Sequence, residues 1–307
     1  MPSVIGKRSV SGLIFDVCNY GGFFLLSLTF IYPFWTIIVQ SFSAAEDIYR
    51  LGLHLFPRRF STEAWGYAVE EERVGLAYFN TIFRVVAGSA WILFVTFTGA
   101  YALAKRDLPG RRVLTTIYIL TLFFNGGLIP TFLLVRGLEL INTRLILTIS
   151  LGSATVIGVN VFYIIIARNF LMTIDQALED SAVIDGASYW QVLWRIIAPL
   201  SKPMIAVIGL FAAVAHWNGW FDAMIYSPDK DLRVLQLMIR DLIADLRVAV
   251  LQDWWEQMRL AGIDIEPFPP EAVQAATIVI TIGPIIFIYP FIQKYFAKGV
   301  MLGSLKG

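Results

Sequence analysis

The sequence predicts an all-α membrane protein with six transmembrane helices. Of its 307 residues, 57% are hydrophobic and only 15% are charged, and the mean hydropathy is +0.68. A soluble domain carries about a quarter charged residues. Six stretches reach the roughly 20 apolar residues that one helical crossing of a bilayer needs. An open strand cannot pair its backbone polar groups in lipid, so each stretch is expected to be a helix.

The whole chain, residues 1–307, is expected to form a single transmembrane domain. Lys7 and Arg8 precede the first span, and no small-x-small cleavage pattern closely follows it. We therefore expect an uncleaved first helix rather than a signal peptide. The six predicted spans cover about 20–41, 78–104, 113–135, 146–167, 202–226 and 272–292.

The orientation is predicted from one short loop. Residues 105–112, KRDLPGRR, contain four basic residues, and short basic loops stay in the cytoplasm. This places both termini, the loop 168–201 and the tail 293–307 in the cytoplasm. The longer loops at about 42–77 and 227–271 then face outside.

Several functional classes receive no support from the sequence. The single cysteine, Cys18, excludes an intramolecular disulfide and a cysteine-based zinc site. His54 and His216 lie far apart, and no metal site is expected. The chain lacks a G-x-x-x-x-G-K-[ST] phosphate loop, and its net charge of +1 does not favour nucleic acid. We expect no catalytic residue and no cofactor bound by this chain.

The loop 168–201 is predicted to contain two short amphipathic helices. Thr173 followed by Gln176 predicts a capping box that starts a helix near Asp175. Gly186 is expected to end that helix in a left-handed turn. Ser188 followed by Gln191 predicts a second capping box. An apolar stripe follows, made of Tyr189, Val192, Leu193, Ile196 and Ile197.

Such a loop can lie on lipid headgroups or dock into the groove of another protein. An interfacial helix is normally rich in Lys and Arg on its polar face. Here the polar positions are acidic, namely Glu179, Asp180 and Asp185. Carboxylates are poorly placed against an anionic leaflet, so docking into a protein groove is favoured.

This segment resembles the EAA coupling loop of ABC importer permeases, whose pattern is roughly E-A-A-x-x-D-G-A followed by L-P and a further Pro. Asp180 and Ser181 depart from the first two letters, and Ala198 stands where Leu is expected before Pro199. In that family the loop inserts its short helix into a cleft of the ATP-binding subunit. The resemblance implies that the ATPase-coupling residues are Glu179, Asp180, Ser181, Ala182, Asp185, Gly186, Ala187 and Pro199.

The resemblance extends from about residue 30 to the end of the chain. FNGGLIP at 124–130, HWNGWF at 216–221 and KGVMLGSLKG at 298–307 are similar to the maltose/oligosaccharide-type carbohydrate-uptake permeases, in the polysaccharide/oligosaccharide branch. This implies a type I ABC importer permease fold and a non-catalytic subunit in the bacterial cytoplasmic (inner) membrane. The implied partners are a second homologous permease, two ATP-binding subunits that hold ATP and Mg, and an extracytoplasmic sugar-binding protein that contacts the outer loop 227–271.

Polar and aromatic residues inside the spans have two interpretations. They can line a translocation pathway, because sugars are held by hydrogen bonds and aromatic stacking, or they can be ordinary helix-packing contacts. His216 and Asp222, six residues apart, would face different sides of one continuous helix. The candidates for the pathway are Asn125, His216, Trp217, Asn218, Trp220 and Asp222.

The glycine-rich tail at 296–307 is either a frayed terminus or, as the resemblance implies, a contact with the ATPase dimer. The candidate residues for that contact are Gly299, Gly303, Lys306 and Gly307.

Two other functional classes remain as alternatives. A secondary transporter usually shows inverted repeats and buried coupling carboxylates, and a membrane enzyme needs a catalytic cluster. Neither pattern is apparent. The resemblance suggests an oligosaccharide substrate, and the sequence leaves open whether it is neutral or acidic, because Arg58 and Arg59 in the first outer loop are offset by Glu70, Glu71 and Glu72.

Overall fold

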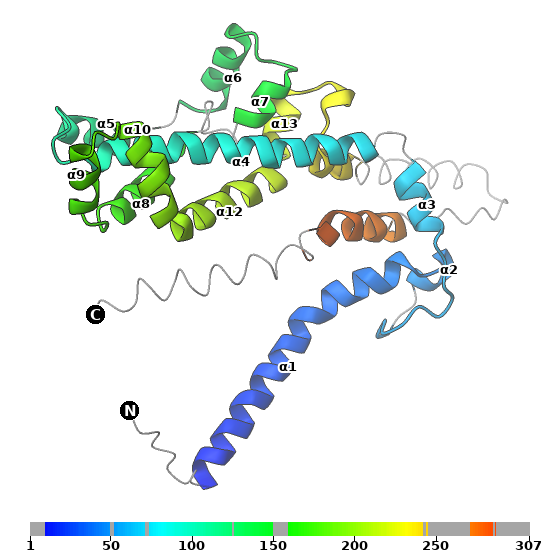
Figure 1. Cartoon of the computed structure of the whole chain (residues 1–307). Coiled ribbons are helices and arrows are strands. Elements are labelled where there is room, and N and C mark those ends of the chain that lie inside the picture. The colour runs from blue at the N-terminus through cyan, green and yellow to red at the C-terminus, as the bar shows by residue number, and fades with distance from the viewer. Residues whose placement is uncertain are drawn as a thin grey trace. The chain divides into compact units, whose positions relative to one another are not determined.

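The computed structural model describes residues 10–49, 52–70, 74–124, 126–149, 159–241, 244, 271–284 and 286, which form helices joined by loops (Figure 1). Among these residues, extended backbone pairs at one isolated bridge between Ser43 and Phe60. The chain divides into two compact units. The first unit comprises residues 1–71 and 242–282, and the second comprises residues 72–241 and 283–307.

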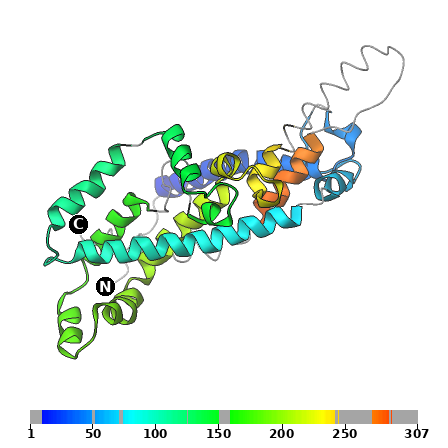
Figure 2. The same cartoon turned by 90° about the horizontal axis from the view of Figure 1, so that it is seen from above.

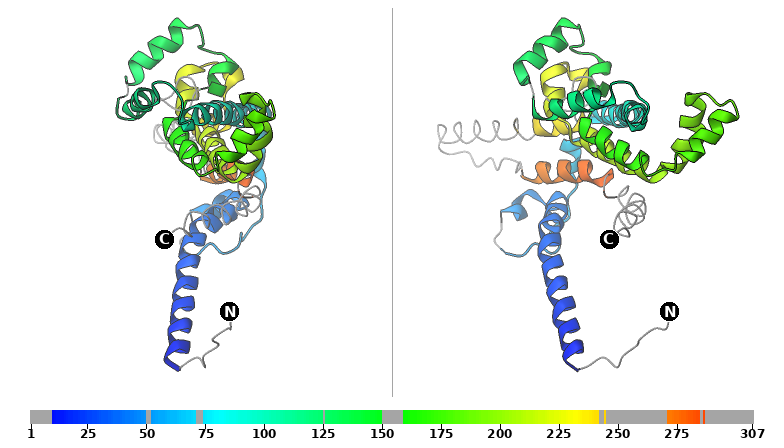
Figure 3. Two further views of the ribbon diagram at one scale, coloured as in Figure 1. Left: turned by 60° about the vertical axis from the view of Figure 1, so that its left-hand side comes forward. Right: turned by 90° about the vertical axis from the view of Figure 1, so that its left-hand side faces the viewer.

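The first unit contains α1 (Val10–Ser41), α2 (Ala45–Ile48), α3 (Glu63–Glu70) and the helix Glu271–Pro284. Helix α1 has 32 residues and a mean hydropathy of 1.9, and it contains the predicted first span (Figure 3). Most of its side chains are exposed in the isolated chain, as expected for a helix surrounded by lipid or partner subunits. A small core joins α2, α3 and the later helix through Ile48, Ala64, Ala68, Ala272, Val273 and Ala276.

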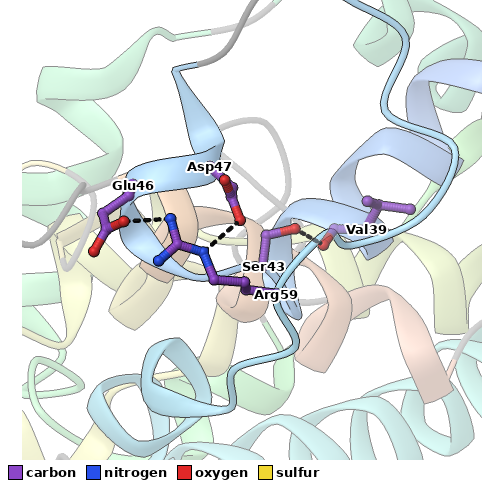
Figure 4. A network of polar contacts seen from close by, with 5 residues as sticks. All are labelled: Val39, Ser43, Glu46, Asp47 and Arg59. Carbon is purple, nitrogen blue, oxygen red and sulfur yellow. Dashed lines mark hydrogen bonds and ion pairs between the residues drawn. The ribbon is translucent and has the colours of Figure 1, made fainter.

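An ion-pair network holds the segment that follows α1. The Arg59 guanidinium pairs with the carboxylates of Glu46 and Asp47, and its Nε lies 3.3 Å from Asp47 Oδ2 (Figure 4). The Ser43 hydroxyl donates a hydrogen bond of 2.7 Å to the carbonyl of Val39 in the last turn of α1. These contacts join Arg59 to α2 and Ser43 to the last turn of α1.

The second unit is built along α4 (Val74–Ala104), a 31-residue helix against which α8 (Val161–Leu171) and α12 (Lys202–Asn218) pack (Figures 1 and 2). Its remaining elements are α5 (Arg111–Phe123), α6 (Leu128–Gly137), α7 (Arg144–Ile149), α9 (Ala177–Ile184), α10 (Tyr189–Val192), the π-helix η2 (Leu193–Ile197), α11 (Ala198–Leu200), α13 (Phe221–Tyr226) and the 3₁₀ helix η3 (Lys230–Leu232).

Glycines let α4 and α12 approach closely, as small residues do between membrane helices. A Cβ atom on Gly88 of α4 would lie 2.3 Å from Nε2 of His216 on α12. A Cβ atom on Gly209 of α12 would lie 3.2 Å from Cδ1 of Leu93 on α4. The spacing of the two helices therefore depends on the missing side chain at Gly88.

Two helices in the described part of the chain, α1 and α4, are long and apolar enough to cross a membrane. Two bent pairs raise the number to four if each is a single broken span: α5 with α6, bent by 116°, and Tyr189–Leu200 with Lys202–Asn218, bent by 85°. The mostly helical architecture is confirmed, and the number of six spans stays a prediction.

The predicted span 146–167 is not one continuous helix. Asn160 adopts an extended conformation, and its side-chain oxygen accepts hydrogen bonds of 3.0 and 3.4 Å from the backbone N–H groups of Phe162 and Tyr163. Helix α8 therefore begins at Val161, because Asn is a strong N-cap residue. The predicted span 202–226 is likewise interrupted, with α12 ending at Asn218 and α13 beginning at Phe221.

Gly88→Ala is expected to destabilise the second unit, whereas Gly99→Ala in the same helix is not. The new methyl at Gly88 meets His216, and overpacking costs about 1–3 kcal/mol, which exceeds the gain of about 1 kcal/mol in helix propensity. At Gly99 the nearest atom lies at an ordinary 3.7 Å. The measurement is the midpoint temperature of aggregation in detergent; equal midpoints for the two variants would contradict the close approach at Gly88.

Candidate functional site: the coupling segment and the buried ion pair

Helix α9 begins later than the sequence predicts and with a different cap. The Ala177 N–H donates a hydrogen bond of 3.0 Å to Oδ1 of Asp175, whereas Gln176 at the N-cap accepts no side-chain cap bond. The Thr173 hydroxyl instead donates to the carbonyl of Phe170. The predicted capping box of Thr173 and Gln176 is therefore wrong, because the Asp175 carboxylate, two residues before Ala177, takes over the capping role.

The turn after α9 follows the prediction. Gly186 has a φ of +84°, the left-handed conformation that favours glycine. The Ala187 N–H donates to the Ala182 carbonyl at 2.9 Å, which closes the turn. The capping box of Ser188 and Gln191 is also confirmed, with both reciprocal hydrogen bonds present.

The apolar stripe that follows packs inside the chain itself. Val192, Leu193 and Ile197 are each less than 4% exposed. They join a core to which α4, α8 and α12 contribute Phe97, Ala100, Tyr101, Ile164, Ala167, Leu171, Met204 and Ile208. Helices α4, α8 and α12 of this chain therefore cover these three residues, and docking of the loop into another protein, which stays a prediction, would involve its other residues.

The helix changes its hydrogen-bond pattern before it enters α12. In η2 the Ala198 N–H donates to the carbonyl of Leu193, five residues earlier. This π-helical turn precedes Pro199, which has no N–H to donate and lies exposed. The chain then bends by 85° at Ser201 into α12. Residues 189–218 thus form an elbow, in which Tyr189–Leu200 and Lys202–Asn218 meet at the bend.

Helix α9 itself carries the exposed face of this coupling segment, residues 177–200. Ile184 is 85% exposed, and Leu178 and Val183 are also exposed. Of the predicted coupling residues, Asp180, Ser181, Asp185 and Gly186 are exposed as well, and Glu179, Ala182 and Ala187 are partly buried. The structure therefore brings these residues together on one projecting helix and turn; their contact with an ATPase stays a prediction.

Lys105, directly after α4, lies where α4, α9 and α10 meet. Its ammonium pairs with the Glu179 carboxylate and lies 4.5 Å from the ring centroid of Tyr101 and 5.3 Å from that of Tyr189. The Tyr101 hydroxyl also donates to Glu179, at 3.2 Å. Partial burial lowers the pKa of Lys105, while the carboxylates of Asp107 and Asp180 oppose that shift.

A buried ion pair organises the second unit away from the coupling segment. Arg84 of α4 pairs with the carboxylate of Asp222, and its other nitrogens donate 2.5 Å to the carbonyl of Gly219 and 3.3 Å to Nδ1 of His216. Arg84, His216 and Asp222 are at most 2% exposed. A buried charge is stable only when it is paired and hydrogen-bonded, so the chain must present its acceptors to Arg84 at this place.

The break between α12 and α13 lets His216 and Asp222 both reach Arg84. His216 lies in the last turn of α12 and Asp222 in the first turn of α13, with Gly219 between the two helices. The expectation that His216 and Asp222 face different sides assumed a continuous helix and is therefore wrong. Arg84 is not among the site residues that the sequence predicted. The sequence does contain a signal for it, because Arg84 is the lone charged residue in an otherwise apolar predicted span.

The pathway candidates fall into separate groups. His216, Trp217 and Asp222 are buried, which favours the packing interpretation for them. Asn218 and Trp220 are exposed and available to a pathway or a partner. Asn125 lies outside the described residues, as do Gly299, Gly303, Lys306 and Gly307 of the tail. Within the described residues, no group of three or more His, Cys, Asp or Glu side chains could hold a metal ion.

Long apolar helices, with the short helix α9 projecting from one end of the second unit, define a helical membrane protein. The chain is 38% identical over 300 residues to Protein LplC of Bacillus subtilis (strain 168). The match covers 97% of this chain and 96% of the relative. It is 35% identical to the polygalacturonan/rhamnogalacturonan transport system permease protein YtcP of the same organism, over 96% of this chain and 99% of the relative.

A solved bacterial ABC transporter involved in the import of the acidic polysaccharide alginate has a chain that superimposes with a TM-score of 0.80 and 32% identity. The match covers 95% of this chain and 99% of that chain. A scan against protein-family models found no match. The chain belongs to the permease subunits of sugar ABC transporters, and it is a membrane-embedded subunit of the oligosaccharide-importer type.

Arg84→Met is expected to destabilise the chain by about 3–5 kcal/mol, because it leaves the Asp222 carboxylate buried without its cation. The double variant Arg84→Met/Asp222→Leu should recover most of this loss, since both charges are removed. The measurement is the fraction of folded subunit after heating in detergent, with Arg136→Met at an exposed site of α6 as control. A double variant that is as unstable as Arg84→Met would contradict the pairing.

Proposed function

We propose that this chain is the permease subunit of an ATP-driven, binding-protein-dependent importer, and that its coupling segment passes ATPase closure to the membrane helices. The observation that carries the proposal is the projecting helix α9, whose Ile184 is 85% exposed next to the left-handed turn at Gly186. Together with the exposed Leu178 and Val183, Ile184 gives this acidic helix an exposed apolar surface, which supports a protein partner that covers it.

The proposed complex contains a second homologous permease, two ATP-binding subunits and an extracytoplasmic sugar-binding protein. ATP and Mg belong to the ATP-binding subunits, and this chain carries no catalytic residue. Closure of the ATPase dimer would move α9, and the elbow at residues 189–218 would convert that movement into a rearrangement of α12 against α4. Rigid-body movement of packed helices around a fixed site is an established route to alternating access.

We propose six spans in a single transmembrane domain of the bacterial inner membrane, with both termini in the cytoplasm. In the second unit, the basic loop after α4 lies beside α9, as the Lys105–Glu179 ion pair shows. Residues 231–235 contact the first turns of α4, since the Asn80 side chain donates to the carbonyls of Asp231 and Arg233. The coupling segment and residues 231–235 of the predicted outer loop thus contact opposite ends of α4, which supports their proposed placement on opposite sides of the membrane.

The proposed substrate is an acidic oligosaccharide. YtcP is named for the transport of polygalacturonan and rhamnogalacturonan, and the solved neighbour is involved in alginate import. Both names describe polymers that contain uronic acids, and these relatives are 35% and 32% identical to this chain. This class of substrate is tested by measuring the uptake of saturated oligogalacturonides in competition with neutral oligosaccharides of equal length.

Ile184→Asp is expected to reduce recovery of the ATPase at least tenfold when the tagged chain is purified in mild detergent, because it places a charge in an apolar contact. Recovery of the second permease should be unchanged. The matched control is Leu138→Asp, an exposed apolar residue at the C-cap of α6 outside the coupling segment. Wild-type chain that purifies alone and transports sugar into liposomes without ATP would overturn the proposed function.

Deletion of residues 300–307 is expected to change the ratio of transported sugar to hydrolysed ATP while the complex still assembles. The reason is the proposed contact of the glycine-rich tail, including Gly303, Lys306 and Gly307, with the ATPase dimer. The ratio is measured in proteoliposomes loaded with ATP. An unchanged ratio would show that the tail is a frayed terminus without a coupling role.

A further inference from the structure

Helix α9 has few attachments to the rest of the chain. Of its eight residues, only Glu179 and Ala182 are partly buried, and the others are exposed. Ala182 packs against the core of the second unit through its single methyl group. The polar attachment is the Glu179 carboxylate, which pairs with Lys105 and accepts a hydrogen bond from the Tyr101 hydroxyl. Ile174 before α9 and Ala187 after it also pack against this core, so Glu179 adds a polar attachment from within the helix itself.

The ion pair of Lys105 and Glu179 is shielded enough from water to contribute to the position of α9. The side chains of Lys105 and Glu179 are 23% and 16% exposed, and the ammonium lies over the faces of Tyr101 and Tyr189. Ion pairs on the open surface contribute little, because water and salt screen them. Here the two aromatic rings exclude water from one side of the ammonium and add cation–π attraction. The pair therefore joins α4, α9 and α10 in one contact.

Helix α4 connects this contact to the buried ion pair. Its 31 residues span about 46 Å at 1.5 Å per residue. One end carries Tyr101 and precedes Lys105, and the other half carries Arg84, which holds His216, Gly219 and Asp222 around the break between α12 and α13. Helix α4 thus carries both contacts, one at the end near α9 and one beside the break between α12 and α13.

We propose that Glu179 is a positioning residue that fixes α9 to the end of α4 through Lys105, so that displacement of α9 by the ATPase is passed to α4 as well as to the elbow at residues 189–218. This inference rests on the proposed function, since it assigns a second route to the same coupling step. Residue Glu179 holds the coupling helix at its base, and the exposed side chains of α9, with Ile184 foremost, contact the ATPase.

The test uses the complete complex in proteoliposomes and measures the ratio of hydrolysis with substrate-loaded binding protein to hydrolysis without it. Lys105→Met and Glu179→Gln should each lower this ratio on the order of fivefold, a typical coupling effect. Lys105→Arg, which keeps a cation over the two aromatic rings and opposite Glu179, should retain at least half of it. Arg106→Met removes an exposed charge one residue away and serves as the matched control.

Each outcome decides between the two proposals. Lys105→Met and Glu179→Gln variants that leave the ratio unchanged, or a Lys105→Arg variant that loses as much as Lys105→Met, would overturn the positioning role. Loss of the ATPase from the purified Glu179→Gln complex, with Lys105→Met retaining it, would place Glu179 in the docking face and also overturn it. An unmutated complex that contains no ATPase would instead refute the proposed function itself.

Discussion

The buried arginine of α4 is the constraint on which the second unit depends. A guanidinium at 1% exposure requires acceptors on several sides, and the chain supplies them with Asp222, the carbonyl of Gly219 and the ring of His216. These acceptors can surround one side chain only because α12 ends before Gly219 and α13 begins after it. The close approach at Gly88, which faces His216, follows from the same need.

The coupling segment divides its residues between two surfaces. Val192, Leu193 and Ile197 of its apolar stripe are buried in the core of the second unit, whereas α9 projects with exposed apolar and acidic side chains. A segment that is anchored on one side and exposed on the other is suited to passing force between proteins. The ion pair of Lys105 and Glu179 adds a direct attachment of the exposed part to the long helix α4.

Local sequence signals predicted much of the coupling segment. The left-handed turn at Gly186 and the capping box of Ser188 and Gln191 depend on neighbours in the sequence, and both are present. The box at Thr173 failed because Asp175, a nearer competitor, satisfies the first free N–H of α9. The family was also predictable, since the resemblance rested on motifs spread over most of the chain, and relatives of up to 38% identity confirm it.

The sequence by itself determined the helical membrane class, the family and the turn and capping box at Gly186 and Ser188, because apolar length and short-range capping act between neighbouring residues. Only the tertiary structure decided which apolar face is buried, where the spans are interrupted and which polar groups meet. Arg84 and Asp222 are 138 residues apart, and Tyr101 and Glu179 are 78 apart. The packing of whole helices determines which residues form such pairs, and no pattern among neighbouring residues predicts them.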